Sequence, residues 1–387
     1  MSFPPTERHL SDPYFTYSNL LNNSPIFRDE QLNAWLVFDY SLVKRLLNTN
    51  SLSAKRNKLS NLSEDQQARY SILKSFYNMW LMYEDPPIHT EMRSFATKFM
   101  KTQQELIEAE ALNSQILIVY RDLEREADTI EFTQQYSNKV SAIVIAHLFK
   151  IDAFNVSSLL FQSECIVELL GQGSVSEESL EASQQALVKV FHFLEANMNI
   201  TELASFMQPV INYKTALAIL TNIFLDGYKS ISTLISNIIY NLLSNQQLQQ
   251  NLCCRNVDSK MVEELIRFDP PFQYISRIAN SDFTVENHNI SQGDKFLLFI
   301  AAANRDPKLF EAPDNIMVER EINPHLSFGY GTHYCIGASM VRRVLDLILN
   351  PLLTKLDSIR LADTVEWEKS IGYRSLKRLP LKIALLQ

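Results

Sequence analysis

One ten-residue stretch, Phe328 to Gly337, constrains this chain more than any other part of its 387 residues. It reads FGYGTHYCIG and holds three of the eight glycines in the sequence. Glycine permits tight turns and close backbone approach, so a flat molecule can lie against such a loop. The apolar helical run that follows points its positive N-terminal end at Cys335. A thiolate held in this way is suited to ligate a haem iron.

The pattern Phe-Gly-x-Gly-x-His-x-Cys-x-Gly resembles the cysteine-ligand signature of the cytochrome P-450 family of haem-thiolate enzymes, and every fixed position is matched. The resemblance implies haem b (heme b, iron protoporphyrin IX) as the cofactor and Cys335 as its iron ligand. It also implies that His333 hydrogen-bonds a haem propionate, and that Phe328 and Gly337 contact the haem. The structural alternative is a buried cysteine in a packed turn.

Composition and charge exclude several classes of protein. The formal net charge of −8 argues against a nucleic-acid binder, and there is no basic run or GxxxxGK loop. No uninterrupted apolar stretch reaches the roughly 20 residues that a membrane-spanning helix needs. The first 22 residues resemble neither a signal peptide nor a membrane anchor. The four cysteines include no CxxC, which argues against a disulfide framework or zinc site and favours a reducing, cytoplasmic compartment.

Hydrophobic periodicity predicts a mainly α fold with a minor β part, in one domain over residues 1–387. The predicted helices are Thr102–Arg125, Ile130–Leu148, Tyr213–Leu248, Asp258–Phe268 and Ala338–Leu356. The predicted strands are Asn33–Phe38 and Lys295–Ala301, with weaker candidates at Phe283–Val285 and Leu381–Leu385. The family resemblance covers nearly the whole chain and is closest to soluble bacterial members. It implies a haem held between a long distal helix and the cysteine loop.

Two further segments carry candidate haem contacts. Asp85 and Pro86 suit a helix start, and His89 and Arg93 then lie four residues apart on one helix face. Two such groups suit a pair of propionates. The spacing resembles the family's His-x-x-x-Arg helix, and Arg277 matches a family arginine beside the other propionate. The alternatives are a solvated helix face and a surface strand arginine.

Glu264 and Arg267 match the family's Glu-x-x-Arg helix motif. A glutamate–arginine pair at this spacing is common on helix surfaces and contributes little there. Because the motif comes just before Asp269-Pro270-Pro271, it resembles the family's buried ion pair. The resemblance implies a structural role for this pair, bracing the segment before Cys335.

The distal helix departs from the family pattern. Relatives carry Ala/Gly-Gly-x-Asp/Glu-Thr where this chain has Asp226-Gly227-Tyr228-Lys229-Ser230. Gly227 matches the glycine that makes room for dioxygen, and Ser230 matches the alcohol of the proton relay. Lys229 occupies the acid position. It is a candidate for a rewired proton path, for pairing with an anion, or for pointing out of the pocket without a chemical role.

Several functions are compatible with this departure. The first is a monooxygenase that uses O2, externally supplied electrons and an atypical proton path. The others are a non-hydroxylating oxidase for phenol coupling or ring closure, and peroxide-driven or rearrangement chemistry. A haem-binding sensor or carrier without turnover is a separate class.

A small lipophilic or aromatic metabolite is the expected substrate, in an apolar pocket with few polar anchors. The candidate aromatic contacts are Phe224, Tyr228, Phe272 and Tyr274, which equally suit an ordinary core. The resemblance to soluble members without a fused reductase implies a ferredoxin or flavodoxin as electron donor. Arg342 and Arg343 are candidate docking residues for it.

Overall fold

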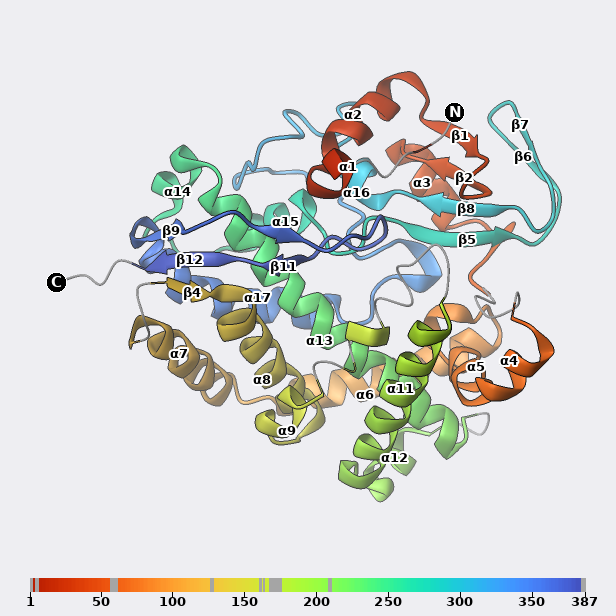
Figure 1. The fold of residues 1–387 in the computed structure, drawn as a ribbon, viewed down its shortest axis with the longest axis horizontal. Coiled ribbons are helices and arrows are strands. Elements are labelled where there is room, and N and C mark those ends of the chain that lie inside the picture. The colour runs from red at the N-terminus through yellow and green to blue at the C-terminus, as the bar shows by residue number, and fades with distance from the viewer. Residues whose placement is uncertain are drawn as a thin grey trace.

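The computed structural model describes residues 3, 7–55, 62–125, 129–159, 162, 164–166, 176–207 and 211–383. Helices dominate, and the strands lie in two places, with β1, β2, β8 and β5 at the upper right and β4, β9 and β12 at the left (Figure 1). The longer helices are α2 (Pro13–Asn23), α6 (Ile88–Leu106), α7 (Ala109–Arg125), α8 (Asn138–Phe149), α11 (Glu177–Asn197), α13 (Tyr213–Leu243), α15 (Ser259–Phe268) and α17 (Ala338–Thr354). This confirms the predicted fold class.

The shorter helical elements mostly connect these. The α-helices are α1 (Glu7–Ser11), α3 (Tyr40–Leu47), α4 (Glu64–Arg69), α5 (Ser71–Tyr77), α9 (Ala153–Ser157), α12 (Ile200–Phe206), α14 (Gln246–Leu252) and α16 (Ile300–Ala303). The single turns of other helix types are η1 (Leu81–Tyr83), η2 (Thr133–Ser137), η3 (Gly331–His333) and η4 (Leu356–Ser358).

The main sheet has the order β1-β2-β8-β5-β3. Its strands are β1 (Ile26–Asp29), β2 (Ala34–Val37), β8 (Lys295–Leu298), β5 (Ile275–Ala279) and β3 (Leu52–Ser53). β2 and β8 are parallel, with Leu36 opposite Leu297, and the other pairs are antiparallel. The smaller sheets contain β4 (Thr129–Glu131), β12 (Pro380–Ile383) and β9 (Ile359–Leu361), then β10 (Glu366–Trp367) and β11 (Leu376–Arg378), and β6 (Phe283–Val285) and β7 (His288–Ile290).

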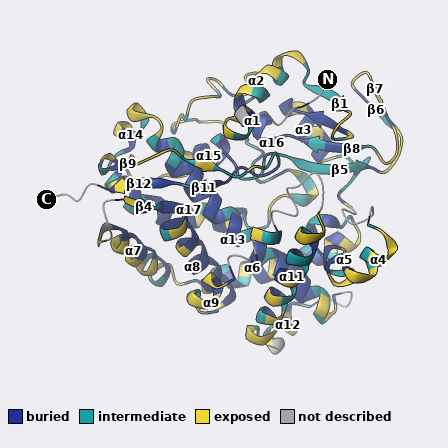
Figure 2. Ribbon diagram, in the orientation of Figure 1, coloured by how far each residue is buried: buried dark blue, intermediate teal, exposed yellow. Residues whose placement is uncertain are grey.

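Helix α13 runs through the centre of the molecule and is buried along most of its length (Figures 1 and 2). Asn212 starts it, because the Asn212 side chain accepts a hydrogen bond from the backbone N–H of Thr215 at 2.9 Å. Helices α6, α8 and α11 pack against it. The long helix is therefore a fixed element on which a cavity wall can be built. Within the described ranges, none of the helices combines the length and apolar character needed to span a bilayer.

Several predicted boundaries were wrong, each for a local reason. The predicted helix Thr102–Arg125 is broken at Ile107, whose backbone is extended and whose carbonyl accepts from Arg343. The predicted helix Ile130–Leu148 starts instead with β4, where Ile130 pairs with Leu381. The predicted helix Tyr213–Leu248 ends at Leu243, and Asn245 caps the next helix, α14.

The strand and terminal predictions also needed adjustment. The apolar run Lys295–Ala301 changes from strand to helix after Leu298, since α16 begins at Ile300. Asn33 lies in a turn with φ of 46°, so β2 is shorter than predicted. Asp258 is the cap of α15, and α17 stops at Thr354. β12 ends at Ile383, and the predicted strand residues 384–385 lie outside the described residues.

Candidate functional site

The cysteine loop is shaped by glycine. Gly329 and Gly331 both have φ of +72°, a backbone region that strongly favours glycine. A Cβ at Gly331 would lie 2.5 Å from Oδ1 of Asn48, so close packing also excludes a side chain there. The backbone N–H of Cys335 donates to the carbonyl of Phe328 at 2.8 Å, which closes the loop. The sequence thus presents Cys335 from a rigid turn directly before α17.

A cavity of about 360 Å³ lies between this loop and α13. Cys335 lines it, so the exposed surface of that residue faces the cavity. Burial raises the pKa of the Cys335 thiol, while a hydrogen bond from the backbone of Gly337 lowers it. Nearby positive charge or a metal ion would therefore be needed to hold the thiolate at neutral pH.

Candidate donor groups cluster at one edge of the cavity. His89, Arg93, Arg277 and His333 all line it. The imidazole rings of His89 and His333 have their centres 4.1 Å apart. His89 is fully buried, and neither of its ring nitrogens has a hydrogen-bond partner among the described residues. Burial, followed by the charge of Arg93, lowers the pKa of His89 to about 4, so the ring is neutral at physiological pH.

Backbone contacts hold these donors in place. Arg93 donates to the carbonyl of Tyr334 at 2.7 Å, which ties α6 to the cysteine loop. The predicted capping of α6 by Asp85 was wrong, because the helix begins at Ile88 without a side-chain cap. The Asp85 carboxylate instead accepts from the backbone N–H of Ala54 at 2.9 Å and from the hydroxyl of Ser53. Asp85 therefore joins the start of α6 to the end of β3.

Glu264 and Arg267 form a fully buried ion pair behind the loop. Two hydrogen bonds of 2.7 and 2.8 Å connect the guanidinium to the carboxylate. Arg320 and Asn323 also donate to Glu264, at 3.0 and 3.1 Å. Arg267 further donates to the carbonyls of Asn304, Pro313 and Asn315. Burial opposes ionisation, yet the bonds from Arg267 hold the pKa of Glu264 below its ordinary value.

A second charged network faces the loop. Arg342 donates to both carboxylate oxygens of Glu263 and to the hydroxyl of Tyr334, and its guanidinium lies 4.7 Å from the ring centre of Phe328. Burial opposes ionisation of Glu263, but bonds from Arg342 and His325 lower its pKa to about 2. Arg343 donates to backbone carbonyls at the end of α6. Both arginines proposed for partner docking are therefore engaged within the chain.

On the opposite side of the cavity, one face of α13 forms the wall. It consists of Asn222, Ile223, Asp226, Gly227, Ser230, Ile231 and Leu234, which recur at helical spacing. A Cβ on Gly227 would lie 3.0 Å from Cδ1 of Ile145, so glycine allows α13 and α8 to approach closely. Of the three distal candidates, Gly227 and Ser230 line the cavity and Lys229 does not.

Lys229 points to another part of the protein. Its ammonium lies 4.0 Å from a carboxylate oxygen of Glu164, and its side chain is 11% exposed. Phe224 also lies off the cavity wall, against Phe149 and Phe193. Tyr228 is buried but does not line the cavity, and its backbone carbonyl accepts a hydrogen bond from the hydroxyl of Ser141. Helix phase explains these three placements, because residues 224, 228 and 229 project away from the wall face.

The other two aromatic candidates do line the cavity. Phe272 packs edge-on against Tyr373 at 5.1 Å, and Tyr274 lies 5.3 Å from Phe299. Tyr373 lines the cavity as well, and its hydroxyl contacts Thr233 of α13 at 3.3 Å. The sequence analysis gave Asp226 no role in the site. The available signal was polar residues four apart, Asn222, Asp226 and Ser230, in an otherwise apolar helix.

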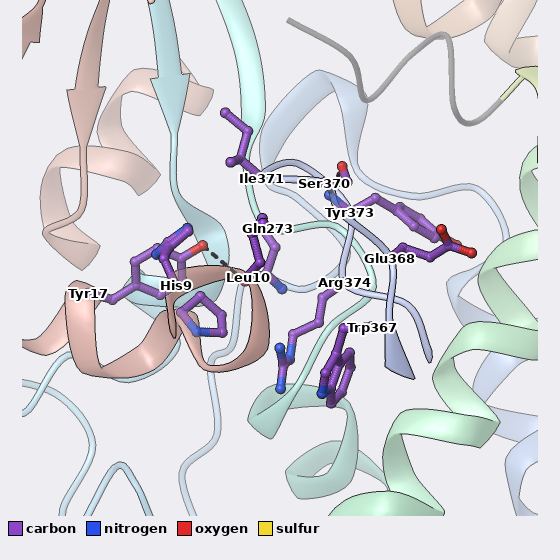
Figure 3. A pocket seen from close by; sticks show the side chains of 11 residues that line it. His9, Leu10, Tyr17, Gln273, Trp367, Glu368, Ser370, Ile371, Tyr373 and Arg374 are labelled. Atoms are coloured by element: carbon purple, nitrogen blue, oxygen red, sulfur yellow. Dashed lines mark hydrogen bonds between the residues drawn. The ribbon is translucent and has the colours of Figure 1, made fainter. Parts of the chain in front are cut away.

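A second, much smaller hollow lies next to the first, between α1, α2 and the segment from Trp367 to Arg374 (Figure 3). Its volume is about 10 Å³, which is room for roughly one water molecule. Arg374 lies against the ring of Trp367 there, at 3.6 Å from its centre, and Tyr373 belongs to both hollows. The larger cavity is therefore the candidate active site.

Both the sequence and the fold of this chain are similar to those of known proteins. The model of the family described as "Cytochrome P450" matches residues 256–375, which include the ion pair and the cysteine loop. The chain is 24% identical to the biotin biosynthesis cytochrome P450 of Bacillus subtilis over 388 residues, covering 96% of each protein. It is 24% identical to the polyketide biosynthesis cytochrome P450 PksS of the same organism, again covering 96% of each.

Solved structures agree in fold. The complex of P450BioI with an acyl carrier protein superposes with a TM-score of 0.85 at 22% identity, over 97% of this chain and 99% of that one. CalO2 superposes with a TM-score of 0.85 at 19% identity, over 99% of each chain. Residues 256–375 match the cytochrome P450 family, and over nearly its whole length the chain is similar to cytochrome P450 proteins and has their fold.

Cytochrome P450 proteins are haem-dependent oxidoreductases of the monooxygenase type. The cavity has the chemistry that a haem requires: a thiol on one side, and two arginines and two histidines along one edge. The His89 ring is fully buried and has no hydrogen-bond partner in the described part of the chain. It could therefore donate to an anionic group of a bound cofactor. The side chains that line this cavity therefore fit the cofactor of that family.

Proposed function

We propose that this protein is a monooxygenase that binds haem b through Cys335 and oxidises a small lipophilic or aromatic metabolite with O2 and externally supplied electrons. The observation that carries the proposal is the cavity itself, with the Cys335 thiol on one side and the Gly227–Ser230 face of α13 on the other. When bound, the haem supplies the iron centre at which dioxygen is activated.

The orientation of the haem is set in this proposal by the donor edge, which is the edge of the cavity lined by His89, Arg93, Arg277 and His333. His89 and His333 would present ring N–H groups to the propionates, and Arg93 and Arg277 would supply compensating positive charge. Phe328 and Gly337 would provide surface for the ring system. Glu264 and Arg267 act at a distance, by fixing the backbone of Asn304, Pro313 and Asn315 that precedes the loop.

Proton delivery on the distal side is assigned to hydroxyl groups. Ser230 lines the cavity and hydrogen-bonds Tyr373, whose hydroxyl contacts Oγ1 of Thr233 at 3.3 Å. Thr233 in turn lies 3.2 Å from the hydroxyl of Ser375. These groups form a chain along which a proton can be passed to Ser230. The distal path is atypical because Lys229, at the usual acid position, is held beside Glu164 instead.

Phe272 and Tyr274 supply apolar surface for the substrate, and Gly227 leaves room for dioxygen. The relative named for polyketide biosynthesis supports a place for this enzyme in secondary metabolism. A ferredoxin or flavodoxin is the proposed electron donor, and the cytoplasm the proposed location. Because Arg342 braces the loop through Glu263, Arg343→Glu is the better test of donor docking. Slower reduction at low salt, with an unchanged haem spectrum, is the expected result.

A carbon monoxide difference spectrum tests the haem assignment. Wild-type protein and a Cys165→Ser control should give the band of thiolate-ligated haem, while Cys335→Ser should lose it. Haem-loaded, folded wild-type protein without that band would overturn the assignment of Cys335. Consumption of reduced nicotinamide cofactor with product formation, dependent on substrate, separates the monooxygenase from a non-catalytic carrier. Hydroxylated product separates it from a coupling oxidase, and turnover with peroxide alone would favour peroxide-driven chemistry.

A further inference from the structure

Among the described residues that line the candidate active site, Asp226 is the one acidic residue. It stands on the wall face of α13, one turn after Asn222 and one turn before Ser230. The rest of that face is mostly aliphatic or glycine. The family pattern has a small residue at this position, so the carboxyl group is a feature of this particular chain. Its surroundings therefore bear on what this chain binds.

The carboxyl group of Asp226 is only half satisfied. Its Oδ2 accepts a hydrogen bond of 2.6 Å from the side-chain amide of Asn222. Its Oδ1 is buried and has no hydrogen-bond partner among the described residues. Burial raises the pKa of Asp226 to about 7, and the bond from Asn222 only partly opposes this. Lys229, three residues away, is directed to Glu164 and gives no compensation.

Aromatic rings border this carboxyl group. Tyr83 of η1 lines the same cavity, and its ring lies 6.1 Å from that of Trp80, stacked on it. Tyr77 packs against both rings, at 4.6 Å from Trp80 and 5.6 Å from Tyr83. Asn222, which holds the carboxyl group of Asp226, also donates to the sulfur of Met82 at 3.8 Å, and Met82 precedes Tyr83 in η1. Burial, then Tyr83, then the charge of Asp226 raise the pKa of Tyr77. Ring faces attract cations, and they do not repel an apolar chain attached to one.

We propose that Asp226 anchors a substrate that carries a positively charged nitrogen on an otherwise lipophilic body. A buried carboxylate without a cation is costly, and a ligand cation removes that cost by pairing with it. Asn222 holds one oxygen and so fixes the direction of the carboxyl group. The proposal rests on the function proposed above, because the anchor would orient the rest of the substrate toward the haem. It adds a substrate class: lipophilic amines and ammonium compounds.

Three probes of one chain length test the anchor in the haem-loaded protein. They are decyltrimethylammonium, its neutral isostere with a tert-butyl head, and decanoate. The quaternary nitrogen has no lone pair, so it cannot ligate iron and confuse the readout. Dissociation constants come from isothermal titration calorimetry and, independently, from the shift of the Soret band. In the wild type, we expect the cation to bind at least roughly 10-fold more tightly than the isostere, and the carboxylate most weakly.

Asp226→Asn should reduce the preference for the cation to less than about 2-fold, while binding of the neutral isostere stays the same. Glu164→Gln is the matched control, because it removes one negative charge beside α13 but outside the cavity. It should keep the wild-type preference. An unchanged preference in Asp226→Asn, or none in the wild type, overturns the anchor. A normal carbon monoxide band in the same samples would leave the haem assignment standing.

The pH dependence of binding in the wild type makes the test independent of the variant. Affinity for the quaternary cation should rise by roughly 10-fold as the pH is raised through about 7, where Asp226 ionises. The groups that face Asp226 are Asn222 and Ser230 of α13, Tyr83 and Tyr77, Tyr373 and Cys335. At the opposite edge, the pKa of His89 is about 4. Affinity for the isostere should stay flat, and equal pH profiles for both probes would contradict the anchor.

Discussion

The buried carboxylates on the two sides of the candidate active site differ in how many hydrogen bonds they accept. Behind the cysteine loop, Glu264 accepts from Arg267, Arg320, Asn323 and the backbone of Met317. On α13, by contrast, Asp226 accepts a single hydrogen bond from the part of the chain that the structure describes, and its donor is Asn222. Satisfied networks make a structure rigid, whereas unsatisfied groups are available to a ligand. The difference indicates that the cysteine side is built to hold one fixed cofactor and the α13 side to accept a variable molecule.

The largest effect is expected from Glu264→Ala, which removes the carboxylate at the centre of the hydrogen-bond network behind the cysteine loop. The substitution leaves Arg267 and Arg320 with buried positive charge and no carboxylate. Removing one partner of a buried pair costs about 3–5 kcal/mol. We expect a loss of that size in urea unfolding, together with loss of bound haem in the purified protein. Glu319→Ala, which removes an exposed partner of Arg255, is the control and should have little effect. Normal stability and haem content in Glu264→Ala would contradict the role of the network.

A smaller effect is expected at the donor edge between the two walls. His89→Phe keeps a planar aromatic ring, somewhat larger than imidazole, but removes both nitrogens, which have no partner in the described part of the chain. Stability without haem should therefore change little or rise. The rate of haem transfer to apomyoglobin should increase by at least roughly 10-fold, since a hydrogen bond to a charged group contributes about 1.5–3 kcal/mol. His192→Phe, at an exposed position of α11, is the matched control. Equal transfer rates would argue against a propionate contact.

The free energy of unfolding of Asp226→Asn, measured without ligand, tests whether the carboxyl group on the α13 side lacks compensation. The pKa of Asp226 is raised to about 7 in the folded protein from an ordinary value of 3.8. The unfolded chain therefore binds fewer protons between these values, and the wild type loses stability as pH rises through this window. We expect Asp226→Asn to be more stable than the wild type at pH 8 by roughly 1–3 kcal/mol, and by less at pH 5. A pH-independent difference in urea midpoints would show that the carboxyl group is already compensated.

The smallest effect is expected from Lys229→Gln. Lys229 makes a 4.0 Å ion pair with Glu164, a residue whose side chain is 46% exposed. Such pairs contribute about 0–1 kcal/mol. Stability, haem content and product should all stay close to those of the wild type. A changed product, or a changed ratio of product to electrons consumed, would restore Lys229 to the proton path and weaken the contrast between the walls.

Sequence patterns predicted those parts of the site whose geometry is local. The cysteine loop, the His89–Arg93 pair and the Glu264–Arg267 pair each lie within one turn or one helix, so spacing alone sets which side chains lie together. Their contacts with Asn48, Asn304 or Tyr334 join distant segments and left no local signal.

The phase of α13 was harder to predict. The helix is apolar nearly all round, because other helices cover its remaining faces, so periodicity did not reveal which stripe borders the cavity. Alignment to the family motif drew attention to Lys229, while the cavity wall contains Asp226 and Ser230. Likewise, the run after Lys295 is apolar as both strand and helix, and only packing decides where β8 gives way to α16.

The parallel pairing of β2 with β8 has a consequence for biosynthesis. Trp35 lies opposite Phe296, so a strand made early in translation must wait for one made more than 250 residues later. β5, which carries Arg277, pairs with both β8 and β3. The donor edge is therefore complete only when strands from the early and the late parts of the chain have paired. A nascent chain released before β8 would lack a finished cradle, so capture of the cofactor should follow synthesis of nearly the whole polypeptide.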